Sequence, residues 1–322
     1  MAVTLLEVVQ SSESTLKQGI VQTIVETSPG LANVPFETVP SLRYEFSKEG
    51  DLPTSAFRAE NAAYTASKGG FNRDTIHLKF LGGQVDIDRK LVNVPTLDGN
   101  NQMAKQLSML SRSVGMNLKK YAFTGSLATD PKAFDGMRPW IADTLASTQT
   151  ITLATNGATI ATATAATTLA KFNALVDACI DVPTAFYTNR NILSQLHALA
   201  TTGATNEVWA QYFRMEVVEV APGVRVRIGN FQGIPIYPLD RDATDTEILA
   251  FDQTTGSSAV TSEIFAVCWG MGRAVMLHDK ADGPEVVSWD DSTGRVVAVD
   301  YGCAMASEHP RAAAVLRGIL TG

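Results

Sequence analysis

The most regular hydrophobic pattern in the chain lies between residues 98 and 125. Its apolar side chains recur at spacings of three and four, the period of one helix face: Met103, Leu107, Leu110, Val114, Leu118 and Tyr121. Asp98 is a candidate N-cap, and Gly125 is a candidate C-terminal stop. The pattern predicts an amphipathic helix of about 25 residues, about 37 Å long.

The charged residues of this helix are all basic. They are Lys105, Arg112, Lys119 and Lys120, and no acidic residue occurs between Gly99 and Gly125. A surface helix turns such side chains away from its apolar stripe. We therefore expect a long helix with a mildly basic outer face.

Alternation with a period of two predicts a long β-hairpin over residues 39–75. Residues 42–46 alternate strictly and residues 56–60 less strictly, while the polar segment Lys48–Thr54 between them contains Gly50 and Pro53, which suit turns. Both strands carry charges, so neither is expected to be deeply buried in its own subunit. A two-stranded hairpin alone is barely stable in water. We therefore expect this hairpin to rest on a neighbouring molecule.

The segments on either side of the hairpin are less regular. Residues 76–80 and 85–88 predict one or two strands, with a bulge or turn at Gly82-Gly83. Residues 1–38 predict an extended arm with some helix, which Ser28–Gly30 would end. No part of this arm resembles a compact domain, so we expect its partners to lie elsewhere. A docked arm and a flexible terminus are both open readings.

The second half of the chain predicts a mixed domain followed by strands. A helix is expected over residues 169–179, a short buried strand over 185–187 and a second helix capped by Asn189. Further strands are expected at 216–220, 224–228, 233–238, 248–251, 264–269, 274–277, 285–289 and 295–304.

Composition and charge narrow the class of protein. For a chain of 322 residues, the length alone leads us to expect about two domains. The net charge of −7 disfavours a protein that holds nucleic acid by bulk positive charge. The charge is uneven, because residues 40–125 carry 12 basic and 8 acidic groups and residues 240–308 carry 4 basic and 13 acidic groups. Complementary patches of this kind favour ordered self-association.

The sequence offers no constellation that would carry catalysis. It contains no phosphate-binding loop, no nucleophile elbow and no dinucleotide fingerprint, and its four histidines form no metal-binding pair. Cys179, Cys268 and Cys303 are far apart and are expected to be buried, reduced thiols. No secretory signal is apparent, and the longest uncharged run, residues 144–170, is too polar to span a bilayer. We expect no enzyme activity, no cofactor, no metal and no membrane partner.

The order of the predicted elements resembles the major capsid proteins of tailed bacteriophages. Six local segments carry this resemblance, each weak alone but all in the order of that family: residues 50–58, 83–92, 134–138, 187–196, 233–237 and 310–315. The first resembles the tip and descending strand of the family's extended loop, and the second resembles the strand that leads to its long spine helix. The resemblance covers nearly the whole chain.

The resemblance implies the α+β fold of that family. Its parts would be an N-terminal arm over residues 1–38, the extended loop over 39–75 and a peripheral domain with the spine helix over 76–140. An axial domain would cover 141–262, and returning strands of both domains with the C-terminus would cover 263–322. The bottom-up reading agrees, because an exposed hairpin, an arm without a partner and opposite charge patches describe a subunit that completes itself on its neighbours.

The implied function is a major capsid protein. Hexamers and pentamers of it would form an icosahedral head around a double-stranded DNA genome, assembled in the host cytoplasm. Portal, scaffold and decoration proteins would be its further partners. The resemblance places intersubunit contacts on the loop residues Glu45, Lys48, Glu49, Asp51 and Arg58. The same reading gives Lys105, Arg112, Lys119 and Lys120 as possible contacts to packaged DNA, weak and without sequence preference.

Two alternatives remain at this point. An encapsulin-like bacterial compartment uses the same fold and encloses a cargo enzyme. An enzyme or small-molecule binding domain of mixed fold would need a site assembled only in three dimensions. Shells seen by electron microscopy favour the two shell proteins, whereas monomers with turnover favour the third reading.

Overall fold

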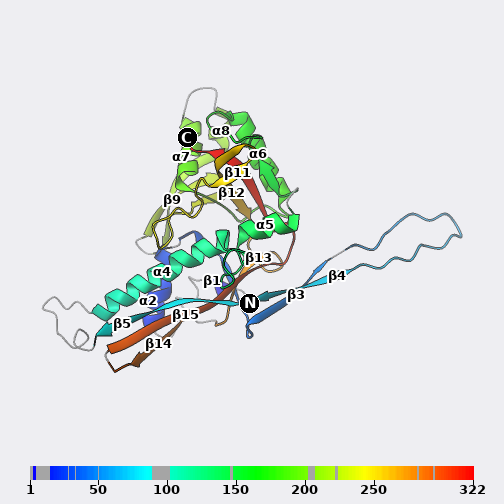
Figure 1. Cartoon of the computed structure of the whole chain (residues 1–322). Helices are drawn as coiled ribbons and strands as arrows, with labels where there is room; N and C mark the ends of the chain where they lie inside the picture. Colours follow the sequence, from blue (N-terminus) through cyan, green and yellow to red (C-terminus); the bar gives the residue numbers. More distant parts are fainter. Residues whose placement is uncertain are drawn as a thin grey trace.

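β-Strands from both halves of the chain build two sheets, and these form two domains (Figure 1). The computed structural model describes residues 3–4, 15–27, 29–32, 34–49, 51–88, 102–145, 148–201, 207–221, 224–280, 283–292 and 294–322. One sheet lies beneath the longest helix and forms the peripheral domain. The other is packed with four helices at the opposite end of the molecule and forms the axial domain.

The peripheral sheet is organised around one long strand, β15 (Gly294–Ser307). β5 (Lys79–Asp88) pairs with it antiparallel on one side. β14 (Glu285–Asp290) and β13 (Ala274–His278) pair with successive halves of the other side. β2 (Pro35–Thr38) extends the sheet parallel to β13, and β1 (Val3–Thr4) pairs with β2.

The predicted long helix is present as α4 (Gln102–Thr124) and packs on β5 and β15, as the apolar stripe requires. Leu107, Val114 and Leu118 are buried beneath it. Its end at Gly125 is as predicted, because the Gly125 N–H donates to the Tyr121 carbonyl at 3.1 Å and a Cβ there would lie 2.5 Å from that oxygen. Asp98, the predicted N-cap, lies outside the described residues.

The arm is docked on its own chain, so of the two open readings the structure shows the docked arm. Helix α2 (Thr15–Thr27) packs along α4, and its side chains Ile20, Val21 and Ile24 are buried. After the short helix η1 (Pro29–Leu31), the chain enters the peripheral sheet as β2. The sequence pattern showed the apolar helix face but not that α4 would supply the surface that covers it.

The hairpin is shorter than predicted and its tip is longer. The strands are β3 (Arg43–Glu49) and β4 (Phe71–His77), with Arg43 opposite His77 and Glu49 opposite Phe71. Residues 56–60, predicted as the second strand, belong to no strand. The segment 51–70 instead forms the extended tip that projects from the molecule in Figure 1.

Gly82-Gly83 marks neither a turn nor a bulge, because β5 runs through it with unbroken register against β15. The glycines serve close packing. A Cβ on Gly82 would lie 2.2 Å from the Val299 carbonyl oxygen, and one on Gly83 would lie 2.9 Å from the Leu110 side chain of α4. The long helix therefore lies close on the sheet at this point.

The axial sheet has the strand order β6-β16-β12-β7-β10-β9-β8, with β11 paired to β12. Its strands are β6 (Thr150–Thr152), β7 (Ala185–Thr188), β8 (Phe213–Ala221), β9 (Val224–Phe231), β10 (Ile234–Pro238), β11 (Gln253–Thr255), β12 (Ser258–Val267) and β16 (Ala313–Leu320). The helices are α5 (Met137–Leu145), α6 (Ala165–Ala178), α7 (Arg190–Thr201) and α8 (Glu207–Tyr212). An aromatic cluster of Phe172, Trp209 and Phe231 lies in this core, with ring centroids 5.0–5.5 Å apart.

Most predicted elements of the axial domain are present, with one exception. Asn189 caps α7 as predicted, and its Oδ1 accepts a hydrogen bond from the Ile192 N–H at 2.8 Å. Residues 248–251, predicted as a strand, do not form one. Leu249 is fully buried, and its carbonyl accepts side-chain hydrogen bonds from Asn189 at 2.9 Å and Ser262 at 3.0 Å. Side chains thus provide the hydrogen bonds that a sheet would otherwise supply.

His278 gives the peripheral domain a pH dependence. The residue is fully buried between β2 and β15, with its Nε2 2.9 Å from the Thr38 hydroxyl, and burial lowers its pKa from 6.5 to about 4. The folded state therefore binds fewer protons than the unfolded state between these values. We expect the free energy of unfolding of unassembled subunits to fall by about 3 kcal/mol as the pH is lowered from 6.5 to 4.

Denaturant titrations at a series of pH values test this expectation. His278→Gln should flatten this part of the stability curve even if the variant is less stable at neutral pH. His197→Gln, at a half-exposed position on α7, should keep the original slope. An unchanged slope in His278→Gln would contradict the assignment.

Candidate assembly surfaces

The extended tip of the hairpin is the most exposed part of the described chain. Every residue from 51 to 73 is exposed, and the tip is held to itself only by a few contacts, such as the hydrogen bond from the Gly70 N–H to the Asp51 carbonyl at 3.0 Å. In Figure 1 it reaches away from both domains. Its own subunit does not cover it.

The extended tip presents large apolar side chains to solvent. Phe57 is completely exposed, Leu52 and Phe71 are about three quarters exposed, and Tyr64 is 69% exposed. Single exposed apolar residues are ordinary, but several on one projecting segment mark an interaction surface. The aromatic residues Phe57 and Tyr64 are the sequence signal for this surface, which the prediction from charges alone did not use.

The five predicted loop residues lie on or next to this surface, and several make contacts within the hairpin. Lys48 is paired with Asp74 at 2.6 Å, and its ammonium lies 5.2 Å from the Phe46 ring centroid. The hydrogen bond from Lys48 lowers the pKa of Asp74. Glu45 is paired with Arg43 at 2.6 Å. The Lys48–Asp74 pair joins β3 to β4, whereas the Arg43–Glu45 pair lies within β3.

Arg58 belongs to the tip itself. Its guanidinium lies 5.2 Å from the Tyr64 ring centroid and donates to the Ala62 carbonyl at 3.2 Å. The backbone carbonyl of Asp51 closes the base of the tip. The side chain of Glu49 lies outside the described residues. Of the five, Arg58 therefore shapes the part of the loop that faces outward.

The base of the hairpin is locked to the peripheral domain by Tyr44. Its hydroxyl donates to Glu308 and lies 3.4 Å from a carboxylate oxygen of Glu37. Burial, followed by the contacts with the two carboxylates, raises the pKa of Tyr44. Glu308 also accepts the Gly272 N–H at 2.5 Å. Sequence reasoning missed this lock, because Glu308 is 264 residues away from Tyr44 in the chain.

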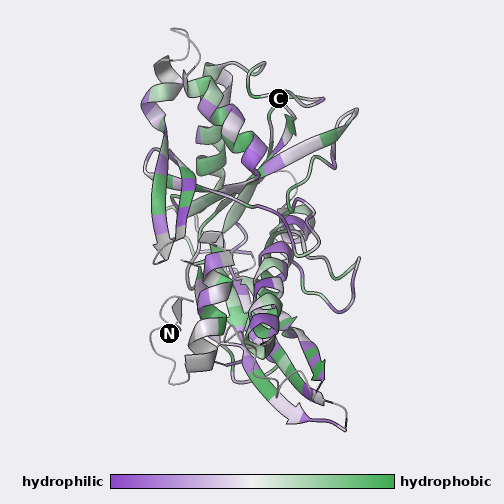
Figure 2. Cartoon of the chain, turned by 90° about the vertical axis from the view of Figure 1, so that its left-hand side faces the viewer, coloured by the Kyte–Doolittle hydropathy of each residue, from purple (hydrophilic) through white to green (hydrophobic). Residues whose placement is uncertain are grey.

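The four cations of α4 divide into two pairs. Lys105 and Arg112 are exposed, seven residues apart on one side of the helix. Lys119 is buried, and burial lowers its pKa. Lys120 is paired with the buried Asp242 at 2.8 Å. Lys119 is therefore not placed to meet DNA, whereas Lys120 keeps 40% of its side chain exposed beside its ion pair; hydrophilic and hydrophobic residues alternate along α4 in Figure 2.

Asp242 shows why Lys120 is held in place. Burial alone would raise the pKa of this carboxyl, but hydrogen bonds from Lys120, Thr244 and the Thr246 N–H outweigh it, so the pKa lies well below its usual range. Asp242 Oδ1 accepts the N–H groups of Thr244 and Thr246 at 2.9 Å each. The carboxylate organises the loop after β10 and fastens it to α4. The position of Asp242 in the sequence did not predict that it would bind a lysine of α4.

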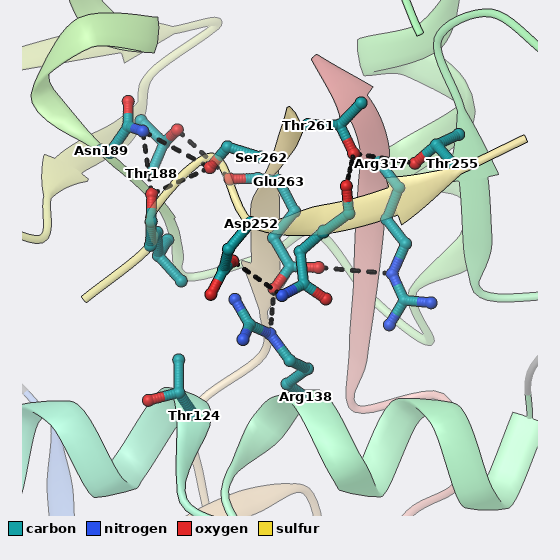
Figure 3. A network of polar contacts seen from close by, with 12 residues as sticks. Thr124, Arg138, Thr188, Asn189, Asp252, Thr255, Thr261, Ser262, Glu263 and Arg317 are labelled. Carbon is teal, nitrogen blue, oxygen red and sulfur yellow. Dashed lines mark hydrogen bonds and ion pairs between the residues drawn. The ribbon is translucent and has the colours of Figure 1, made fainter. Parts of the chain in front are cut away.

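A buried ion network fixes the axial sheet to α5 (Figure 3). Glu263 on β12 is completely buried. It accepts from Arg138 Nε of α5 at 2.5 Å and from Arg317 Nε of β16 at 3.3 Å. The register of β12 and β16 shifts beside it, between Ser262 and Ile264. Sequence analysis gave no hint of this triad, because its members come from three distant segments.

The peripheral sheet has an outer face that α4 does not cover. Residues of β5 alternate, with the odd-numbered ones half-buried or buried beneath α4 and the even-numbered ones exposed. Phe80 on β5 is 59% exposed, and Val287 and Trp289 on β14 are each 44% exposed. Asp86 and Asp88 lie on the same exposed face. This face is the second apolar surface that no described residue of the chain covers.

The described residues hold no metal cluster and no bilayer-crossing helix. No group of three or more histidine, cysteine, aspartate or glutamate side chains is placed to bind a metal within the part of the chain that the structure describes. Nor does any helix in the described ranges combine the length and apolar character needed to cross a membrane.

Comparison with known proteins now identifies the class. The model of the phage capsid family matches residues 12–251, most of the chain, so the chain belongs to that family. It is a structural protein of the kind that builds capsid and encapsulin shells. No curated protein matches the sequence.

Solved structures support the same fold at low sequence identity. The SrpI encapsulin from Synechococcus elongatus PCC 7942 is 12% identical, with a TM-score of 0.60 over 90% of this chain and 86% of the other. The capsid of a native GTA particle is 12% identical, with a TM-score of 0.58 over 92% and 90%. A structure from Mycobacterium phage Bobi is 11% identical, with a TM-score of 0.57 over 93% and 90%. The predicted capsid-type α+β fold is confirmed.

The Glu263 triad gives a stability prediction. Removing one member of a buried ion network leaves the others without compensation. We expect Glu263→Ala to lower the free energy of unfolding by about 3 kcal/mol, measured by urea denaturation of unassembled subunits. Glu263→Gln should lose less, because it keeps the volume and some hydrogen bonding. Glu247→Ala, at an exposed position, is the control and should change stability by less than about 0.5 kcal/mol. A Glu263→Ala variant as stable as this control would contradict the prediction.

Proposed function

We propose that this protein is a major capsid protein whose copies assemble as hexamers and pentamers into an icosahedral head around double-stranded DNA. Membership of the phage capsid family supports this proposal. The observation that carries it is the extended tip at residues 51–70, which is fully exposed, as are residues 71–73 of β4, and which is rich in apolar side chains. Such a segment is stable only when a neighbouring molecule covers it.

In this proposal the tip of one subunit lies on the peripheral domain of the next. The exposed apolar residues of the outer sheet face, Phe80, Val287 and Trp289, offer a surface for Phe57 and Tyr64. Repeating the contact around an axis closes a ring, in which each subunit gives one loop and receives another. The ion pair of Lys48 with Asp74 holds the two strands of the hairpin together.

The charge distribution supports self-association and only weak contact with DNA. The segment 40–125 is net positive, whereas 240–308 is strongly negative. Lys105 and Arg112 are the exposed cations of α4, and we propose that they face packaged DNA. Two contacts per subunit hold a genome without preventing its release. Portal, scaffold and decoration proteins would complete such a head, and the particle would assemble in the host cytoplasm.

An encapsulin-like compartment is the second candidate. The observation in its favour is the TM-score of 0.60 with the SrpI encapsulin. Both candidates predict shells, so the contents of particles purified from the producing cells distinguish them. Nuclease-protected genomic DNA supports the phage head, and an enclosed protein cargo without DNA supports the compartment.

Assembly should depend on the apolar residues of the tip. We expect the double variant Phe57→Ser/Tyr64→Ser to yield folded subunits with unchanged circular dichroism but no shells in electron micrographs, because the intersubunit contact loses its apolar area. The matched control Phe57→Leu/Tyr64→Phe keeps that area and should still form shells. Normal shells from the double serine variant would refute the proposed contact.

DNA binding by unassembled subunits should be weak and steeply salt-dependent. With about two phosphate contacts, the log–log slope of affinity against salt should be near −1.8, measured by fluorescence anisotropy on duplex DNA. Lys105→Gln/Arg112→Gln should bring this slope close to zero. Lys132→Gln, at another exposed position, is the control. Tight binding above physiological salt, or a preference for one sequence, would argue against this role.

A further inference from the structure

Two of the three cysteines lie side by side, although 89 positions separate them in the sequence. Cys179 follows α6, and Cys268 follows β12. The Cys268 thiol donates to the Asp181 carbonyl at 3.5 Å, only two residues from Cys179. The Cys179 thiol lies 3.6 Å from the Leu175 carbonyl, and the two thiols are close enough to shift each other's pKa in opposite directions. Both residues are buried.

The backbone holds the two cysteines in this arrangement. The N–H of Ile180 donates to the Arg311 carbonyl at 2.9 Å, and the N–H of Cys268 donates to the next carbonyl, that of Ala312, at 2.8 Å. One short segment before β16 thus binds the chain at both cysteines. The Arg311 side chain adds hydrogen bonds to the Cys179 carbonyl at 2.9 Å and to two carbonyls at the end of α6. The same short segment therefore holds the backbone beside both cysteines in place.

The environment shifts the pKa values of the two thiols in opposite directions. The hydrogen bond with Cys179 lowers the pKa of Cys268 to about 7 against the opposing effect of burial, and the Arg273 cation helps. The same hydrogen bond and burial raise the pKa of Cys179. Cys303, in the peripheral sheet, has its pKa raised mainly by burial. A thiolate next to a second thiol is the arrangement of a reactive and a resolving cysteine.

We propose that Cys179 and Cys268 are a dithiol that closes to a disulfide when the protein meets a peroxide. The Cys268 thiolate attacks one peroxide oxygen, breaking the O–O bond, and becomes a sulfenic acid while hydroxide leaves. Cys179 then attacks the Cys268 sulfur, forms the S–S bond and releases water. The balance is two thiols and one hydrogen peroxide to one disulfide and two waters. The two cysteines together lose two electrons, and the peroxide gains them.

The bond would join the end of α6 to the end of β12 within the axial domain. A cross-link that closes a long loop removes conformational freedom from the unfolded chain and so stabilises the fold. The timing rests on the proposed function: subunits stay reduced during assembly in the cell, and the bond forms after a particle leaves it. Assembly therefore does not require the bond, which is added to a finished fold.

Mass spectrometry of the full chain tests the proposal. Reduced protein is treated with a small molar excess of hydrogen peroxide, unfolded in an alkylating reagent and digested. We expect free thiols to fall from three to one and a peptide to appear that links Cys179 to Cys268. Cys303→Ser should form the same link, whereas Cys179→Ser and Cys268→Ser should not. Unreacted thiols, over-oxidised Cys268 without a link, or a link to Cys303 would each overturn the proposal.

Thermal unfolding provides the second measurement. Peroxide should raise the unfolding midpoint of the wild type and of Cys303→Ser by about 5 °C, and should leave those of Cys179→Ser and Cys268→Ser unchanged. The measurement is made on unassembled subunits. A failure of the proposed capsid function would appear instead as an absence of shells, with the disulfide result unaffected. A disulfide that forms without raising the midpoint would overturn its stabilising role.

Discussion

The pairing of β15 with β5 is the interaction on which the rest of the peripheral domain depends. Ten consecutive residue pairs, from Gly294 opposite Asp88 to Cys303 opposite Lys79, hold the two strands in one register. That register presents a continuous inner face to α4 and, through α4, a surface for α2. It also fixes where the hairpin joins the sheet, because a single residue, Leu78, separates the end of β4 from the start of β5. A slip by one residue would turn every side chain of β5 to the wrong face.

The extended tip separates the folding of one subunit from its association with neighbouring subunits. One buried core runs from the peripheral sheet to one face of the axial sheet and a second lies on the axial sheet, so a subunit can fold before it meets a neighbour. The tip adds apolar surface that this fold leaves uncovered, and its free energy is recovered only on association. The base is fixed by Tyr44 and by the ion pairs of the hairpin, which limits the freedom that a neighbour must remove.

Sequence alone predicted the elements whose pattern is local. The apolar stripe and the terminal glycine of α4 could be read directly, as could the capping role of Asn189 and the capsid-type fold through six ordered segments. It failed where the deciding contact is distant. Gly82-Gly83 is typical of a turn, and only its packing against β15 and Leu110 shows why glycine is needed there. The burial of Lys119 and the pairing of Lys120 with Asp242 depend on residues far away in the chain. The Glu263 triad leaves no pattern in the sequence. Residues 248–251 form a short apolar run typical of a buried strand, but side chains bind the carbonyl of Leu249 instead.

Glu308 connects the hairpin to the two chain crossings between the domains. It receives the hydroxyl of Tyr44 at the base of the hairpin and the N–H of Gly272, which lies on the crossing from the axial strand β12 to the peripheral strand β13. Glu308 itself lies on the return crossing, between β15 and β16. The projecting hairpin is therefore a lever whose pivot is the junction of the two domains. A force on its tip would therefore act at this junction and change the angle between the two domains. The curvature of one subunit can in this way respond to the position of the next.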